Sequence, residues 1–107
     1  MNDDLFSWAF IENAFRSIRK EKRHFKTYIL LDSASGLYKI GRAVYVDKRV
    51  KALSVANANL SIVMIIERNV ENELHKAYSD KIVKSEWFRL TEKDIKDINF
   101  KYNNSSL

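Results

Sequence analysis

The chain has 107 residues, of which 46% are hydrophobic and 31% charged, so it predicts a single folded domain rather than a disordered chain. The longest unbroken apolar run, 62–66, is too short to span a membrane. The acidic start of the chain lacks the positive charge of a secretory signal. Because there is no cysteine, a disulfide scaffold is excluded. With only two histidines, His24 and His75, we do not expect a multi-histidine metal site. We expect a cytoplasmic protein.

The net charge of +5 comes from two short segments. Residues 16–26 carry six basic residues and one acidic residue, and residues 39–51 carry five and one. Such segments attract a polyanion such as nucleic acid, although a solvated surface is the alternative interpretation. The predicted nucleic-acid contacts are Arg19, Lys20, Lys22, Arg23, Lys26, Arg42, Lys48 and Lys51.

The first element in chain order is a helix over residues 4–20. One apolar stripe at helical spacing consists of Leu5, Trp8, Ile11, Phe15 and Ile18. Phe6 and Phe10 lie on a second face, so the helix either wraps its own domain or meets a second copy of the chain. We therefore expect an amphipathic helix with a basic end over residues 1–25, and a homodimer through it is one hypothesis.

Two strands follow over 27–31 and 37–41, joined by a hairpin loop that contains Gly36. The later elements are a helix over 45–54, a strand over 60–67, a helix from an Asn69 N-cap to 79, an extended segment over 86–90 and a helix capped by Thr91. This order predicts an α+β domain over 26–100 with a small, mostly antiparallel three-stranded sheet flanked by helices, an extra N-terminal helix and a frayed tail over 101–107.

The hairpin loop predicts the register of the two strands. If Asp32 faces Leu37, then Tyr28 faces Gly41, and alternation places both on the same face as Lys39. Gly41 would leave open space over the phenol, and Lys39 would lie diagonally from Tyr28 at roughly 7–8 Å. From the hairpin alone, the favoured interpretation is structural: Tyr28 is a β-former, Lys39 a surface residue and Gly41 a bulge.

The motifs along the chain resemble those of the GIY-YIG nuclease superfamily. Its tyrosine strand matches Tyr28-Ile29-Leu30, its second strand matches Leu37-Tyr38-Lys39-Ile40-Gly41, and its Arg-x-x-x-Leu helix matches Arg49 to Leu53. Two further motifs look like those of a small, phage-rich branch: Glu71-x-x-Leu74-His75-x-x-Tyr78 and Glu86-Trp87-Phe88-x-Leu90. The resemblance covers about residues 26–99.

The resemblance implies a metal-dependent DNA endonuclease. By this resemblance, Tyr28 would take a proton from the attacking water. Lys39 stands in place of the family's second tyrosine. The Lys39 side chain would either lower the pKa of the Tyr28 phenol or act as the base itself. Arg49 would hold the scissile phosphate and Glu71 would bind one Mg²⁺ or Mn²⁺. His75 matches a further catalytic position and Gly41 the motif glycine.

Other interpretations of these residues stay open. Arg49 also fits a surface base, Glu71 a first-turn carboxylate favoured by the helix dipole, and His75 a structural histidine. Trp87 and Phe88 fit a core better than a base-stacking surface. Ala43 stands near a position where many members have a hydroxyl residue, and the family's late asparagine has no clear match. The alternative functions are a nucleic-acid-binding module with little cleavage and an interaction protein that dimerises through its first helix.

The two basic segments predict that nucleic-acid affinity falls steeply with salt. If they contact about five phosphates, log K should fall with log salt by roughly 4 to 5, measured by fluorescence anisotropy with a labelled duplex. Charge reversal at Arg19 and Arg23 should flatten this slope. A wild-type slope near zero would mean that the partner is not a polyanion.

Overall fold

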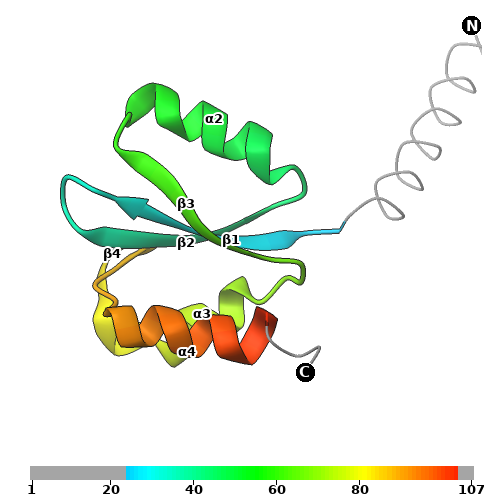
Figure 1. The fold of residues 1–107 in the computed structure, drawn as a ribbon, viewed down its shortest axis with the longest axis vertical. Helices are drawn as coiled ribbons and strands as arrows, with labels where there is room; N and C mark the ends of the chain where they lie inside the picture. The colour runs from blue at the N-terminus through cyan, green and yellow to red at the C-terminus, as the bar shows by residue number, and fades with distance from the viewer. Residues whose placement is uncertain (1–23, 104–107) are drawn as a thin grey trace, which may run out of the picture.

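The structure is a computed structural model that describes residues 24–103. Five strands form one antiparallel sheet in the order β3-β1-β2-β5-β4, with α2 on one face and α3 and α4 on the other (Figure 1). The strands are β1 Lys26–Asp32, β2 Leu37–Ala43, β3 Leu60–Ile66, β4 Ile82–Lys84 and β5 Trp87–Phe88. The helices are α2 Val46–Ala56, α3 Glu71–Ala77 and α4 Glu92–Asn103, with a 3-10 turn, η1, over Ser79–Lys81.

The α+β class is confirmed, but the three-stranded sheet is wrong because β4 and β5 add two strands. These two strands have three and two residues and turn back on each other at Ser85, whose φ is 55°. Strands this short are too brief to show a hydrophobic period in the sequence. The expected N-terminal helix lies outside the described residues. Within residues 24–103, no helix is long and apolar enough to cross a membrane.

The predicted hairpin register is confirmed from Asp32 opposite Leu37 to Tyr28 opposite Gly41. The Asp32 carboxylate accepts hydrogen bonds from the Ala34 N–H and the Ser35 hydroxyl, at 3.1 and 2.8 Å. Gly36 has φ +75°, a value that glycine adopts without a Cβ penalty, and its N–H donates to the Asp32 carbonyl. Local turn chemistry therefore sets the register of the whole hairpin.

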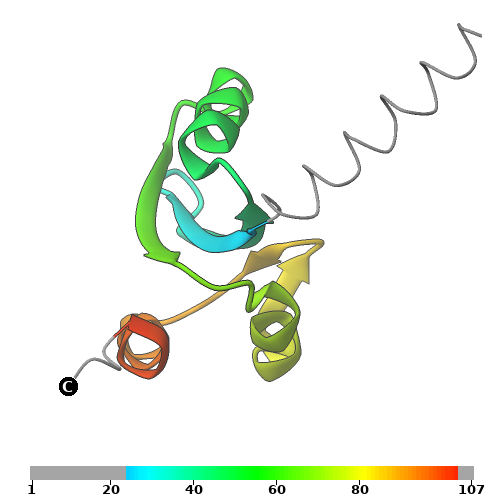
Figure 2. The ribbon, with the colours of Figure 1, turned by 90° about the vertical axis from the view of Figure 1, so that its right-hand side faces the viewer.

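Helices cover both faces of the sheet, so the interior strand β1 is buried on both sides (Figure 2). Ile29 faces α3 and α4, while Tyr28 and Leu30 face α2. Toward α3 and α4 the core consists of Ile29, Ile40, Met64, Ile66, Val70, Leu74, Phe88, Leu90, Ile98 and Tyr102. Toward α2 it consists of Tyr28, Leu30 and Val46, with Ala43, Val50, Leu53, Leu60 and Ile65 against them.

The helix ends differ in part from the prediction. Thr91 caps α4 as expected, since its hydroxyl accepts from the Asp94 N–H at 3.1 Å. The Asn69 cap is wrong: α3 begins at Glu71, after Val70, without a capping side chain from its own segment. Helix α4 continues through Asn103, so residues 101–103 are helix rather than frayed tail. Tyr102 in this last turn is buried, and its hydroxyl donates to Glu73 at 2.9 Å.

Asp94 ties the start of α4 to η1. Its carboxylate accepts from the Thr91 N–H at 2.9 Å and from the Lys81 ammonium at 2.5 Å. Burial opposes ionisation of Asp94, but the bonds from Lys81 and Thr91 outweigh it, and the pKa of this carboxyl is lowered. Because the unfolded chain then binds the proton more readily, this stabilisation is present above about pH 4 and is lost as the pH falls through and below that value.

We therefore expect Asp94→Asn to lower the free energy of unfolding by about 1–3 kcal/mol near neutral pH, measured by urea denaturation. The variant should also lose less stability than the wild type between about pH 5 and pH 2. Asp97→Asn is the matched control, because its ion pair with Lys93 is on the exposed surface. Equal costs for the two substitutions would mean that the Asp94 bonds stabilise the fold no more than a surface ion pair does.

Candidate active site

The Tyr28 side chain lies across β2 at Gly41. A Cβ atom placed on Gly41 would lie 2.5 Å from both Cζ and the hydroxyl oxygen of Tyr28. The expected open space over the phenol is therefore filled by the ring itself, and the residue is only 1% exposed. The glycine is required for this close approach, since Gly41 has no unusual backbone conformation.

Arg49 is the basic group beside this phenol. Burial raises the pKa of Tyr28, and a hydrogen bond and the charge of Arg49 only partly oppose it. The carboxylates of Glu86 and Glu71 raise the pKa further. The prediction of a lowered pKa is therefore wrong, and the phenol is neutral near pH 7. Arg49 follows the buried Val46 by three residues on α2, which places it at the edge of the helix face that packs on the sheet.

Lys39 forms an ion pair with Glu86. Their Nζ and Oε1 atoms are 3.3 Å apart, and the Lys39 side chain is only 13% exposed. The Lys39 ammonium also lies 5.4 Å from the centre of the Trp87 ring. The sequence motif that begins at Glu86 predicted no role for this carboxylate, yet its charge acts on Tyr28. Glu86 is the site residue that sequence reasoning missed, although its place before Trp87-Phe88 was the available signal.

Beyond Lys39, the outer edge of β2 no longer pairs with a neighbouring strand among the described residues. Strand β5 pairs with β2 only at Tyr38 and Lys39, and the Ile40 N–H donates to the Glu86 carbonyl at 3.1 Å. Next to that bond, His75 Nε2 donates to the Ile40 carbonyl at 2.9 Å. The same ring meets the Phe88 ring edge-on at 4.9 Å. This geometry gives His75 a structural role in fastening α3 to the edge of β2.

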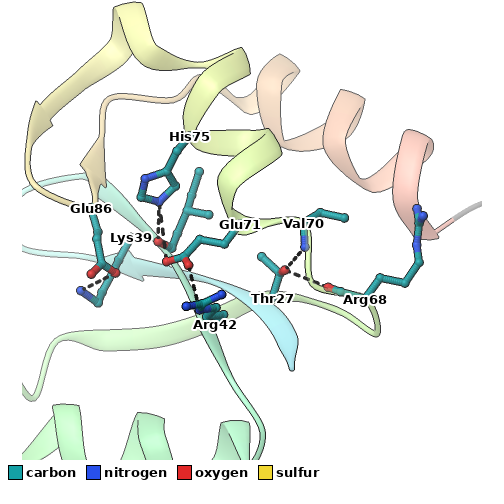
Figure 3. Close-up of polar contacts among 9 residues, drawn as sticks. Thr27, Lys39, Arg42, Arg68, Val70, Glu71, His75 and Glu86 are labelled. Carbon is teal, nitrogen blue, oxygen red and sulfur yellow. Dashed lines mark hydrogen bonds and ion pairs between the residues drawn. The ribbon is translucent and has the colours of Figure 1, made fainter. Parts of the chain in front are cut away.

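Glu71 begins α3 and lies over the same edge (Figure 3). Its carboxylate is 3.4 Å from Arg42 Nε and 3.9 Å from His75 Nε2, and its side chain is 14% exposed. Arg42 is exposed and also packs on the Phe25 ring at 5.0 Å. The carboxylate expected to bind metal is therefore already balanced by an arginine.

A divalent cation would have one carboxylate ligand here. In the part of the chain from 24 to 103, no group of three or more His, Asp or Glu residues is placed to hold a metal. Mg²⁺ in phosphoryl-transfer sites takes one or two carboxylates and completes its shell with water and phosphate oxygens. The Glu71 carboxylate fits that mode, provided that Arg42 gives way.

The other predicted basic residues divide into three groups. Arg42, Lys48 and Lys51 are exposed, and Lys26 pairs with Glu67 at 3.3 Å. The Lys48 ammonium lies 5.4 Å from the centre of the exposed Tyr45 ring. Four residues lie outside the described part of the chain: Arg19, Lys20, Lys22 and Arg23.

A family model described as the T5orf172 domain matches residues 25–102. The matched range includes every residue of the candidate site, from Tyr28 on β1 to Glu86 before β5. Neither the search of curated proteins nor the search of solved structures finds a match.

The contact between Tyr28 and Gly41 predicts strong coupling between the two positions. Gly41→Ala should lower the free energy of unfolding by about 1–3 kcal/mol, since the new methyl group collides with a confined ring. In a Tyr28→Leu background, which lacks the end of the ring, the same substitution should cost roughly nothing or stabilise the strand. Urea denaturation of the four chains gives the coupling energy, and additive effects would contradict the proposed contact.

Proposed function

Because this chain belongs to the T5orf172 domain family, we propose that it is a metal-dependent endonuclease that hydrolyses phosphodiester bonds of DNA. The family is phage-associated, in the class related to GIY-YIG and HNH-like endonucleases, and indicates a nuclease or a DNA-binding module. The observation that carries the proposal is that Arg49 on α2 and Glu71 on α3 both act electrostatically on the Tyr28 phenol of β1, while Glu71 meets Arg42 at the outer edge of β2. A phenol, a guanidinium and a carboxylate can serve as proton acceptor, phosphate clamp and metal ligand in such hydrolysis.

In this proposal Arg49 holds the scissile phosphate. Its guanidinium offers a planar set of N–H donors, which suits two phosphate oxygens at once. Arg49 is exposed, yet it also interacts with the Tyr28 hydroxyl, so a phosphate bound to it lies beside the phenol. Lys48, the preceding residue on α2, and Arg42 on β2 would contact neighbouring phosphates.

Glu71 would hold one Mg²⁺ or Mn²⁺. The bound ion supplies stabilisation of the charge that develops on the leaving oxygen. Arg42 must first leave the carboxylate, and a DNA phosphate offers its guanidinium an alternative anionic partner. Substrate binding would therefore free Glu71 for the ion.

Tyr28 is the proposed acceptor of the proton from the attacking water. Lys39 is a weaker candidate, because its Nζ atom is already engaged in an ion pair with the Glu86 carboxylate at 3.3 Å. The raised pKa of Tyr28 makes the phenolate scarce near neutral pH. The rate of cleavage should therefore rise with pH into the alkaline range.

A nucleic-acid-binding module with little cleavage is the second candidate. Two observations favour it: Glu71 is balanced by Arg42, and the Tyr28 phenol is buried and neutral. In that case the basic residues on β2 and α2 would bind DNA without a reaction at the edge of β2.

A plasmid-nicking assay with Mg²⁺ or Mn²⁺ separates the two candidates. Tyr28→Phe keeps the ring and removes only the hydroxyl, so cleavage should fall by about 10²–10⁴-fold while the fold is retained. Tyr38→Phe is the matched control on the neighbouring strand, and its cleavage should match the wild type. Glu71→Gln should lose cleavage, whereas Glu67→Gln, at an exposed ion pair, should keep it.

The pH dependence provides an independent readout. The wild-type rate should increase about tenfold per pH unit toward alkaline pH, and Tyr28→Phe should lose this dependence. An unchanged slope in Tyr28→Phe would assign the base to another group. If the wild type nicks DNA no faster than Glu71→Gln does, the enzyme hypothesis is wrong and the binding module is supported.

A further inference from the structure

Thr27 is a fully buried polar residue that the proposed reaction does not use. It precedes Tyr28 on β1 and has no exposed surface. Its hydroxyl donates to the Arg68 carbonyl at 2.8 Å and accepts from the Val70 N–H at 2.8 Å (Figure 3). Both partners lie in the loop that leads from β3 to α3. One side chain therefore fastens this loop to the start of β1.

The bond to Val70 acts as a helix cap. The first N–H groups of a helix have no partner within the helix, and a Ser, Thr, Asp or Asn just before it usually supplies one. Helix α3 has no such side chain in its own segment. Thr27 supplies the acceptor from a different strand, 43 residues earlier in the chain. The seven-residue helix α3 therefore has its first turn tied to the sheet.

The hydrogen bond between Thr27 and Val70 joins two residues that each directly precede a residue of the proposed site. Thr27 is adjacent to Tyr28, and Val70 is adjacent to Glu71. We propose that Thr27 is a positioning residue of the active site, which sets where Glu71 lies relative to Tyr28. This inference rests on the proposed function, because Glu71 needs a fixed place only if it holds a metal ion.

The other contacts of Glu71 and α3 do not fix the position of Glu71 once a metal ion is bound. Its ion pair with Arg42 involves a half-exposed guanidinium, and it must break before a metal ion binds. His75 fastens α3 to the Ile40 carbonyl one turn later, and Leu74 is buried in the core. These contacts hold the middle of the helix. Tyr102 holds Glu73 in the first turn, and the Thr27 bond holds Val70, directly before Glu71. The Thr27 bond survives the departure of Arg42.

Thr27→Val tests this proposal, since valine keeps the shape of threonine and removes both hydrogen bonds. We expect the amide hydrogen of Val70 to exchange faster than the rest of α3, measured by NMR on the free protein. We also expect Mn²⁺ affinity, measured by electron paramagnetic resonance, and DNA nicking each to fall by about 10–100-fold, as when a ligand loses its orienting partner. Thr27→Ser retains the hydroxyl and should stay within about threefold of the wild type.

Thr91→Val is the matched control. It makes the same substitution and removes the cap of α4, away from the site. It should lower stability while leaving Mn²⁺ affinity and nicking unchanged at a temperature where both chains are folded. If Thr27→Val is too unstable to assay, Thr27→Cys, with its weakly hydrogen-bonding thiol, should shift all three readouts in the same direction.

Two failures can be told apart. If the wild type nicks DNA and Thr27→Val nicks it equally, with unchanged Mn²⁺ affinity, Thr27 is only structural and the inference is wrong. If the wild type neither nicks DNA nor binds Mn²⁺ through Glu71, the proposed function is wrong, and the positioning role is wrong with it.

Discussion

The arrangement of the site depends on the contact between the Tyr28 ring and Gly41. Because position 41 has no side chain, the end of the Tyr28 ring lies against β2 at Gly41 within the layer that α2 covers. The hydroxyl thereby reaches the strand whose outer edge meets Glu86 and α3. Arg49 approaches the same hydroxyl from α2. A missing methyl group thus allows groups from opposite faces of the sheet to act on one phenol.

Charge pairing is the second property of the site. Lys39 is matched by Glu86 and Arg42 by Glu71, so each carboxylate has a basic partner before any ligand arrives. A polyanion that binds here exchanges partners with these pairs rather than filling an empty positive pocket. The two pairs differ in exposure: Lys39 is largely buried, whereas Arg42 is half exposed. Arg42 is therefore the partner that changes most readily, and it is the one that covers the carboxylate expected to bind metal.

Sequence reasoning succeeded where a few neighbouring residues decide the structure. The Asp32 to Leu37 loop sets the hairpin register, and the spacing of Val46, Val50 and Leu53 sets the face of α2. It failed where distant segments meet. The pKa of Tyr28 depends on burial between β1, β2 and α2, and the cap of α3 comes from Thr27 on β1. Neither the pKa of Tyr28 nor the cap of α3 produces a recognisable pattern in the neighbouring sequence. Strands β4 and β5 are likewise too short to show an alternation of apolar and polar residues.

The early end of β5 has a consequence for how the molecule behaves in a crowded solution. An unpaired strand edge is a template on which another chain can add a strand, which leads to aggregation. Beyond Lys39, no described strand covers the outer side of β2. The His75 bond already occupies the Ile40 carbonyl there, and the charged side chain of Arg42 stands next along the edge. The residues that border the site thus also protect an edge that the proposed function requires to stay open.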